Sequence, residues 1–290
     1  MKPLPSVFAA LLMVASAQEP VPGPAPATPA PPATAPVPSP SFGAPSVFIL
    51  CGSPGDEAHH TLFEKRLTSL RKSLTRAGLP LADIHIYYGP ESAGYRGTAG
   101  RGNVQKVCAA IVEQTNAGRP AWLMVMGHAN DAPGDVRFNV PGGDVSGKEL
   151  AGWLKEAAKG DKAAPLNIIL TTACSGRAVK HLAGPGRSII AATDAQEGAD
   201  ESMFADGLVQ AFESGTADTN KDGELSMTEI FLAARAAVLS TYKSQGYILT
   251  EHAGLDGDGD GRATQRPAEN DATAGAKPGH ALKIKSGSSS

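Results

Sequence analysis

Short apolar runs alternate with segments of helical periodicity from residue 46 to residue 255. Runs of this length, rich in β-branched residues and bounded by glycine or polar positions, are typical of buried strands in a parallel sheet. The predicted strands are residues 47–51, 84–88, 121–126, 166–170 and 188–192. Because strand and helix patterns alternate, the sequence predicts an α/β fold with a mostly parallel sheet and helices on both faces.

Apolar positions between the predicted strands recur every three or four residues, as at Phe63, Leu67 and Leu70. This spacing places them on one face of a helix. Two longer helices are predicted at about 200–214 and 227–244, with a polar loop between them. We therefore expect one globular domain over residues 46–255 that includes a helix–loop–helix unit.

The two ends of the chain differ in composition from this domain. Residues 1–17 carry a lysine, a short apolar stretch and an Ala-Ser-Ala site, which together predict a secretory signal peptide. The stretch is too short to span a bilayer, so no transmembrane segment is expected. Residues 18–45 are rich in Pro and Ala and predict a disordered linker. Residues 256–290 predict an acidic Asp/Gly turn and a flexible tail. A secreted or periplasmic location follows.

Charge and cysteine content narrow the function classes. The formal net charge is −3, and no basic patch with interleaved aromatic residues occurs, so nucleic-acid binding is not expected. The three cysteines, Cys51, Cys108 and Cys174, are an odd number in a chain predicted to be exported. At least one of them must stay free or pair between molecules. The sequence does not indicate an oligomeric state.

Two of the predicted strands end in residues with nucleophilic chemistry. His128 follows residues 121–126 after one glycine, and Cys174 follows residues 166–170 after Thr-Thr-Ala. Ligands bind outside the carboxyl ends of parallel strands, where both residues fall. A thiol beside an imidazole is the minimum equipment for nucleophilic acyl transfer. A helix predicted after Cys174 should lower the pKa of its thiol.

The motifs around these two residues occur in the order found in a known superfamily. Gly127-His128 and Phe138–Asp144 precede Ala173-Cys174, and Ala191–Thr193 and Glu201–Ala205 follow it. This ordered set resembles the caspase-like cysteine peptidases, in particular legumain-like enzymes and their exported bacterial relatives. The resemblance implies a caspase-like three-layer sandwich. It also implies an endopeptidase or transpeptidase that acts on protein or peptide substrates through a thioester.

The resemblance also implies roles for individual residues. Cys174 matches the nucleophile, and His128 matches the general base and acid. The backbone N–H of Ala129 matches an oxyanion donor, at a position where the family usually has glycine. Ser202 matches a residue that helps to shape the substrate pocket.

Several alternatives stay open at this stage. A shift of register by one residue would make Ser175 the reactive position, although a thiol is the better nucleophile at neutral pH. An inactive, calcium-binding scaffold that binds protein or peptide partners at the cell surface would keep the same motifs. A hydrolase of non-peptide acyl bonds would also use the same pair. The other histidines, including His59 and His60, have no pattern that assigns them a role.

The loop between the two longer helices has the pattern of an EF-hand. Oxygen-bearing residues stand at positions 1, 3, 5, 9 and 12 of a twelve-residue segment, with glycine at position 6. The backbone carbonyl supplies the ligand at position 7. The predicted Ca²⁺ ligands are Asp218, Asn220, Asp222, Glu224, Ser226 and Glu229.

A second acidic segment repeats the first half of this pattern. Asp256, Asp258 and Asp260 alternate with glycine, but Pro267 stands where the bidentate glutamate is required. A weak second calcium site and a flexible acidic turn are both compatible with these residues.

Overall fold

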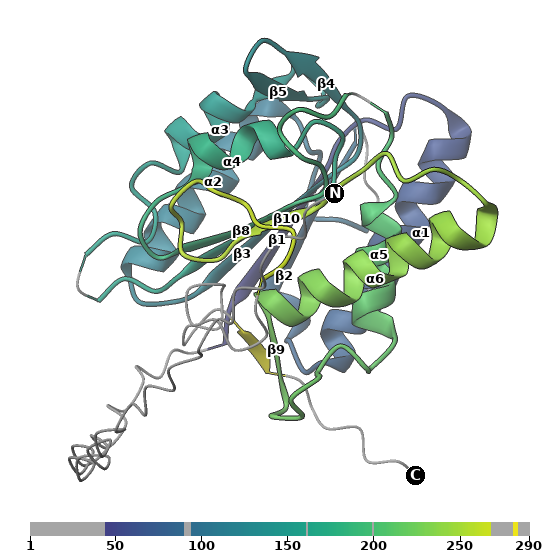
Figure 1. The fold of residues 1–290 in the computed structure, drawn as a ribbon. Coiled ribbons are helices and arrows are strands. Elements are labelled where there is room, and N and C mark those ends of the chain that lie inside the picture. The colour runs from purple at the N-terminus through teal and green to yellow at the C-terminus, as the bar shows by residue number, and fades with distance from the viewer. Residues whose placement is uncertain (1–43, 90–93, 161, 199, 268–280, 284–290) are drawn as a thin grey trace, which may run out of the picture. The chain divides into compact units, whose positions relative to one another are not determined.

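The computed structural model describes residues 44–89, 94–160, 162–198, 200–267 and 281–283. A six-stranded sheet crosses the domain in the order β10-β8-β7-β3-β1-β2 (Figure 1). All neighbouring strands are parallel except the edge strand β10, which runs antiparallel to β8. The strands are β1 (Ser46–Cys51), β2 (Ile84–Tyr88), β3 (Ala121–Met126), β7 (Leu166–Leu170), β8 (Arg187–Ala191) and β10 (Gly254–Asp256).

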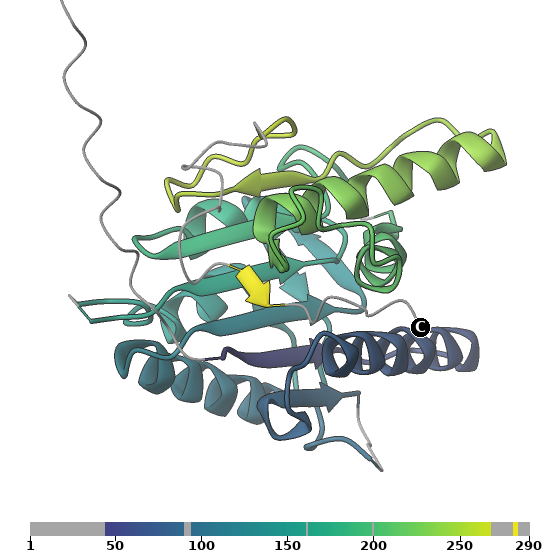
Figure 2. The same ribbon diagram turned by 90° about the horizontal axis from the view of Figure 1, so that it is seen from below.

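Helices cover both faces of this sheet, which confirms the predicted three-layer α/β sandwich (Figure 1 and Figure 2). One face packs against α1 (Glu57–Arg76), α5 (Phe204–Glu213) and α6 (Met227–Gln245). The other packs against α2 (Arg101–Asn116), α3 (Gly147–Trp153) and α4 (Gly176–Leu182). Because both faces are covered, every residue of β1, β3 and β7 is buried. This burial explains why those strands are apolar throughout.

A second, antiparallel sheet of three short strands lies between β3 and α3 in the chain. It consists of β4 (Ala129–Ala132), β5 (Asp135–Phe138) and β6 (Val145–Ser146). This sheet contributes three buried side chains to the hydrophobic core, those of Val136, Phe138 and Val145. The sequence pattern did not reveal these strands, because their polar residues interrupt any apolar run.

Helices α5 and α6 pack closely and flank the predicted calcium loop. Gly207 on α5 permits the approach, since a Cβ atom there would lie 2.6 Å from the carbonyl oxygen of Ala234 on α6. Within the loop, β9 (Glu224–Ser226) pairs antiparallel with β11 (Ala281–Lys283). The buried Leu282 of β11 faces Leu225 of β9.

The C-terminal part of the described chain continues beyond residue 255. Asp256 is the last residue of β10 and is fully buried, and Thr264 forms two backbone hydrogen bonds with Leu255. The predicted signal peptide at 1–17 and all but two residues of the predicted linker at 18–45 lie outside the described residues. So do residues 268–280 and 284–290 of the predicted tail. No helix of the described residues is long and apolar enough to cross a membrane.

Candidate functional site

The carboxyl ends of two neighbouring parallel strands carry His128 and Cys174. Strands β3 and β7 pair in register, with Val125 opposite Leu170. The pairing extends one step further, because the backbone N–H of Thr171 donates to the carbonyl of Val125 at 3.0 Å. The sheet thus brings the histidine and the cysteine to the same edge, as the strand pattern predicted.

Cys174 occupies a strained and buried turn. It is one of three non-glycine residues with positive φ in the described chain, at 55°, and its side chain is 0% exposed. A left-handed conformation of this kind costs roughly 1–3 kcal/mol and is concentrated at functional sites. The Sγ atom donates a hydrogen bond to the carbonyl of Gly198 at 3.2 Å. The thiol is therefore covered by the segment that follows β8.

Burial raises the pKa of the Cys174 thiol, and the negative charge of Asp200 raises it further. The sequence predicted the opposite direction, from the dipole of the helix that follows. That helix, α4, does begin at Gly176, but it is only seven residues long. Desolvation of the thiolate is the largest cause of the raised pKa of Cys174. A thiol with a raised pKa needs a base to accept its proton as it attacks a substrate.

The turn around Cys174 is fixed by Ser175 and Gly176. The Ser175 hydroxyl accepts hydrogen bonds from the backbone N–H groups of Ala192 at 2.9 Å and Thr193 at 3.3 Å. At Gly176, a Cβ atom would lie 2.3 Å from the carbonyl oxygen of Thr193. The Ser175 oxygen thus holds the end of β8, which favours Cys174 over Ser175 as the reactive residue.

His128 is half-buried and held in one orientation. Its Nε2–H group donates a hydrogen bond to the carbonyl oxygen of Pro54, at 3.0 Å. This hydrogen bond selects the tautomer with a free Nδ1. Phe63 packs against the ring, with centroids 5.3 Å apart. Sequence reasoning missed the Pro54 carbonyl, since a backbone acceptor leaves no signal in residue type.

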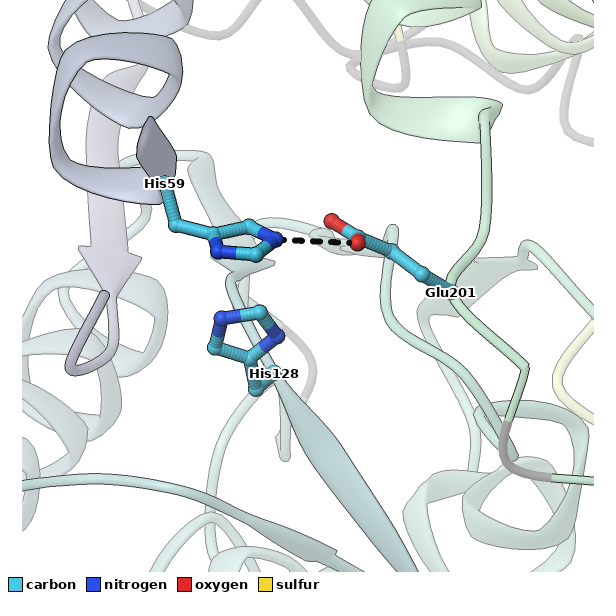
Figure 3. Close-up of side chains that lie close together, drawn as sticks. All are labelled: His59, His128 and Glu201. Carbon is cyan, nitrogen blue, oxygen red and sulfur yellow. Dashed lines mark hydrogen bonds and ion pairs between the residues drawn. The ribbon is translucent and has the colours of Figure 1, made fainter. Parts of the chain in front are cut away.

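A second histidine, His59, lies directly beside His128. The two rings are 4.6 Å apart and nearly perpendicular, at 73°. The Nδ1 of His59 bonds both carboxylate oxygens of Asp56 at 2.8 Å, and its Nε2 lies 3.2 Å from Oε2 of Glu201 (Figure 3). The hydrogen bonds to Asp56 and then to Glu201 raise the pKa of His59.

The cluster of His59, His128 and Glu201 was not predicted from the sequence. The sequence held part of the signal, because His59 lies in the first turn of α1, the helix that follows the carboxyl end of β1 after a short loop. Parallel strands bring such positions to one edge of the sheet. Glu201 lies 142 residues from His59 in the chain, and nothing in the spacing connects the two.

The other two residues predicted around the site take well-defined places. Ala129 opens β4 and is buried, and its φ is not positive, so the position does not require glycine. Ser202 is buried, donates to the carboxylate of Glu251 and accepts from the backbone N–H of Phe204. Ser202 therefore links Glu251 to the first residue of α5 in this structure. The oxyanion role of Ala129 and the substrate role of Ser202 stay predictions.

The predicted calcium loop folds so that its own backbone N–H groups hold the acidic side chains. Gly223, at φ 82°, donates to Oδ2 of Asp218 at 3.1 Å, and Asp222 donates to Oδ1 of Asn220 at 3.0 Å. The carboxylate of Glu229 accepts from the backbone of Thr219 at 2.9 Å. Oδ1 of Asp218 is buried without a hydrogen-bond partner. An orphaned buried carboxylate oxygen of this kind is the group that a bound cation would satisfy.

The end of the loop joins the start of α6. Ser226 is the N-cap of this helix, and its hydroxyl and N–H both bond Oε2 of Glu229, at 2.9 Å and 3.0 Å. The backbone N–H of Glu224 donates to Oδ1 of Asp222 at 2.8 Å. The six predicted ligand residues thus belong to one hydrogen-bonded loop. Calcium binding itself stays a prediction.

The second acidic segment forms a tight turn at the end of β10. Oδ1 of Asp256 accepts from the N–H groups of Gly259 at 2.8 Å and Asp260 at 3.2 Å, and Oδ2 accepts from Gly261 at 2.9 Å. Burial raises the pKa of Asp256. One carboxylate oxygen from each of Asp256, Asp258 and Asp260 lies within 4.8 Å of the others. Metal binding at this turn stays a prediction.

No family model matches the chain, and no curated protein matches it. Solved structures with partial likeness include the Drosophila initiator caspase Dronc, at 13% identity over 76% of this chain and 81% of that one, with a TM-score of 0.45. Caspase-1 from Spodoptera frugiperda shares 9% identity over 74% of this chain and 87% of that one, with a TM-score of 0.47. Likeness at these values assigns neither family nor activity, so we infer function from the residues of the site.

Proposed function

We propose that the chain is a cysteine peptidase in which Cys174 is the nucleophile and His128 is the general base and acid. One observation carries this proposal. The two residues follow neighbouring parallel strands, β3 and β7, and His128 is oriented by the carbonyl of Pro54. A nucleophile, a base and a group that orients the base are the components of nucleophilic catalysis. The substrate class is a protein or peptide, cleaved internally or transferred to another amine.

In the proposed reaction, Nδ1 of His128 accepts the thiol proton as Sγ of Cys174 attacks the carbonyl carbon of the scissile amide. The tetrahedral oxyanion accepts hydrogen bonds from the backbone N–H groups of Cys174 and Ala129. As the C–N bond breaks, the imidazolium returns the proton to the departing amine and a thioester remains. Water, activated by the same nitrogen, hydrolyses the thioester in an endopeptidase. An amine replaces the water in a transpeptidase.

The covered thiol places one condition on this reaction. Because Cys174 is 0% exposed and bonded to Gly198, substrate must displace the segment that follows β8. Arg177 holds that segment through the carbonyls of Ala195 at 3.1 Å and Glu197 at 3.2 Å. We therefore take the structure to be the closed state of the enzyme, with the segment that contains Gly198 as the part that opens.

We further propose that the loop from Asp218 to Glu229 binds Ca²⁺ and stabilises the helix pair α5 and α6. The orphaned Oδ1 of Asp218, the left-handed turn at Gly223 and the acidic donor set support this assignment. Bound Ca²⁺ would neutralise the carboxylates that the loop gathers. We assign the ion a structural role, because the loop connects α5 and α6. The proposed catalytic residues, His128 and Cys174, follow other elements, β3 and β7.

The proposed location is outside the cytoplasm, either secreted or periplasmic. This proposal is supported by the signal-peptide pattern of residues 1–17. The structure has three free thiols, Cys51, Cys108 and Cys174. Free thiols at Cys51 and Cys108 are compatible with export, because both are buried in the core, where oxidants have little access.

A second candidate function is supported by the same buried thiol. A protein that keeps this sheet but never exposes Cys174 would be a calcium-stabilised scaffold that binds protein or peptide partners. The raised pKa and the full burial of Cys174 favour this candidate.

Cleavage of an unfolded protein substrate by the calcium-loaded chain distinguishes the two candidates. The proposal expects peptide fragments from the wild type and from the matched control Cys108→Ala, and none from Cys174→Ala. Fragments that persist in Cys174→Ala would refute the peptidase. So would a wild-type chain that binds the substrate protein and leaves it intact.

A further inference from the structure

The side chains of His59, His128 and Glu201 converge at the edge of the sheet (Figure 3). One ligand atom from each lies within 4.8 Å of the other two. Ligand atoms around a tetrahedral Zn²⁺ ion, bound at 2.0–2.1 Å, are separated by roughly 3.3 Å. The three groups would therefore have to close by about 1.5 Å or less to hold one ion. The Glu201 side chain is 49% exposed, so it is free to make this adjustment.

Each histidine of the cluster is already oriented as a metal ligand would be. Asp56 bonds Nδ1 of His59 through both carboxylate oxygens, which directs Nε2 toward Glu201. The carbonyl of Pro54 bonds Nε2 of His128, which leaves Nδ1 for a ligand. Metal-bound histidines almost always give their other ring nitrogen to a carboxylate or a backbone carbonyl in this way. The hydrogen bonds that Asp56 and Pro54 form with the outer nitrogens are an observation independent of the proximity of the three side chains.

From this arrangement we infer that His59, His128 and Glu201 form a binding site for a divalent transition-metal ion, with Zn²⁺ the best fit. Two imidazoles and one carboxylate are ligands that suit Zn²⁺, whereas Ca²⁺ and Mg²⁺ prefer an all-oxygen set. Three protein ligands leave a fourth position for water or for a substrate group. The site is therefore distinct in chemistry from the calcium loop between α5 and α6.

Metal binding at this site has a consequence that rests on the proposed function. The nitrogen of His128 that is free to bind the metal, Nδ1, is also the nitrogen that accepts the proton of Cys174. A coordinated nitrogen has no lone pair for a proton. Zn²⁺ and proton transfer are then mutually exclusive, and the ion switches the peptidase off.

Calorimetric titration of the full chain with Zn²⁺, in saturating Ca²⁺, tests the metal site. We expect one Zn²⁺ per chain in the wild type and loss of that binding in His59→Gln and Glu201→Gln. The matched control is His60→Gln, because the neighbouring His60 bonds Tyr88 at 2.6 Å and lies outside the cluster. Asp56→Asn keeps all three ligands and should weaken binding by about 10–100-fold. Equal binding in wild type, His59→Gln and Asp56→Asn, or none in the wild type, would overturn the inference.

Labelling of Cys174 by a peptidyl electrophile, with and without Zn²⁺, separates this inference from the proposed function. Zn²⁺ should slow labelling of the wild type at the concentrations that fill the site and have no effect on His59→Gln. Zinc binding that depends on His59 in a chain that is never labelled would uphold the metal site and refute the peptidase. Labelling that Zn²⁺ leaves unchanged, in a chain that binds no Zn²⁺, would uphold the peptidase and refute the metal site.

Discussion

Gly176 has no room for a side chain, and replacing it with alanine should damage both stability and the Cys174 turn. A Cβ atom at Gly176 would lie 2.3 Å from the carbonyl oxygen of Thr193 and 2.6 Å from the backbone nitrogen of Ala195. Both contacts are with backbone, which cannot swing aside as a flexible side chain would. Because ordinary contact begins at 3.4 Å, the strand end must shift by about 1 Å relative to the turn.

The expected cost follows from two opposing effects. Forcing a methyl group into a packed site with a backbone shift costs typically 1–3 kcal/mol, and three backbone contacts under 3.0 Å place Gly176→Ala at the upper end. Alanine recovers up to about 1 kcal/mol through its better helix propensity. The net loss in the free energy of unfolding is about 2 kcal/mol. For a domain of this size, that loss corresponds to a decrease in Tm of about 4–8 °C.

Gly102→Ala is the matched control, because Gly102 also lies near the start of a helix but would place its Cβ in open space. It should raise the free energy of unfolding by about 0.4–1 kcal/mol. Urea denaturation followed by circular dichroism measures both values, and iodoacetamide labelling measures the exposure of Cys174. Labelling should be faster in Gly176→Ala only. Equal stability of the two variants, with unchanged labelling, would refute the packing argument.

Three further predictions concern calcium, pH and the covering segment. Ca²⁺ should raise the Tm of the wild type, and Glu229→Gln should abolish the rise; a melt unchanged by chelator would contradict the calcium proposal. Because burial raises the pKa of Cys174, its alkylation rate should keep rising with pH beyond the point where the cysteines of the unfolded chain level off. A plateau at or below that point would contradict the burial argument. Arg177→Ala should speed alkylation of Cys174 several-fold by releasing the segment at Gly198, and an unchanged rate would show that this segment does not limit access.

The main sheet could be predicted from the sequence because its central strands are buried on both faces. Burial of this kind forces continuous apolar runs such as Val47–Cys51 and Ala121–Met126, which no exposed element would tolerate. The short strands β4 to β6 could not be predicted in this way, since their exposed positions are polar. The edge strand β10 pairs with β8 across more than 60 residues of chain, and this contact leaves no local pattern.

Only those residues of the candidate site that directly follow a strand could be predicted from the sequence. His128 and Cys174 follow apolar strands directly, so the sheet fixes their shared edge. His59 and Glu201 come from a helix start and a connecting segment, whose approach depends on how α1 and α5 pack. The burial of Cys174 depends on the path of the segment after β8, which local residue patterns do not encode.

The dependence of Cys174 labelling on His128 tests the central claim most directly. The calcium-loaded chain is incubated with a peptidyl electrophile, and the adduct is located and timed by mass spectrometry. The account predicts one adduct, on Cys174, which forms about 10²–10⁴-fold more slowly in His128→Ala. An adduct on Cys174 that forms at the same rate without His128, or labelling on Cys51 or Cys108 instead, would contradict it.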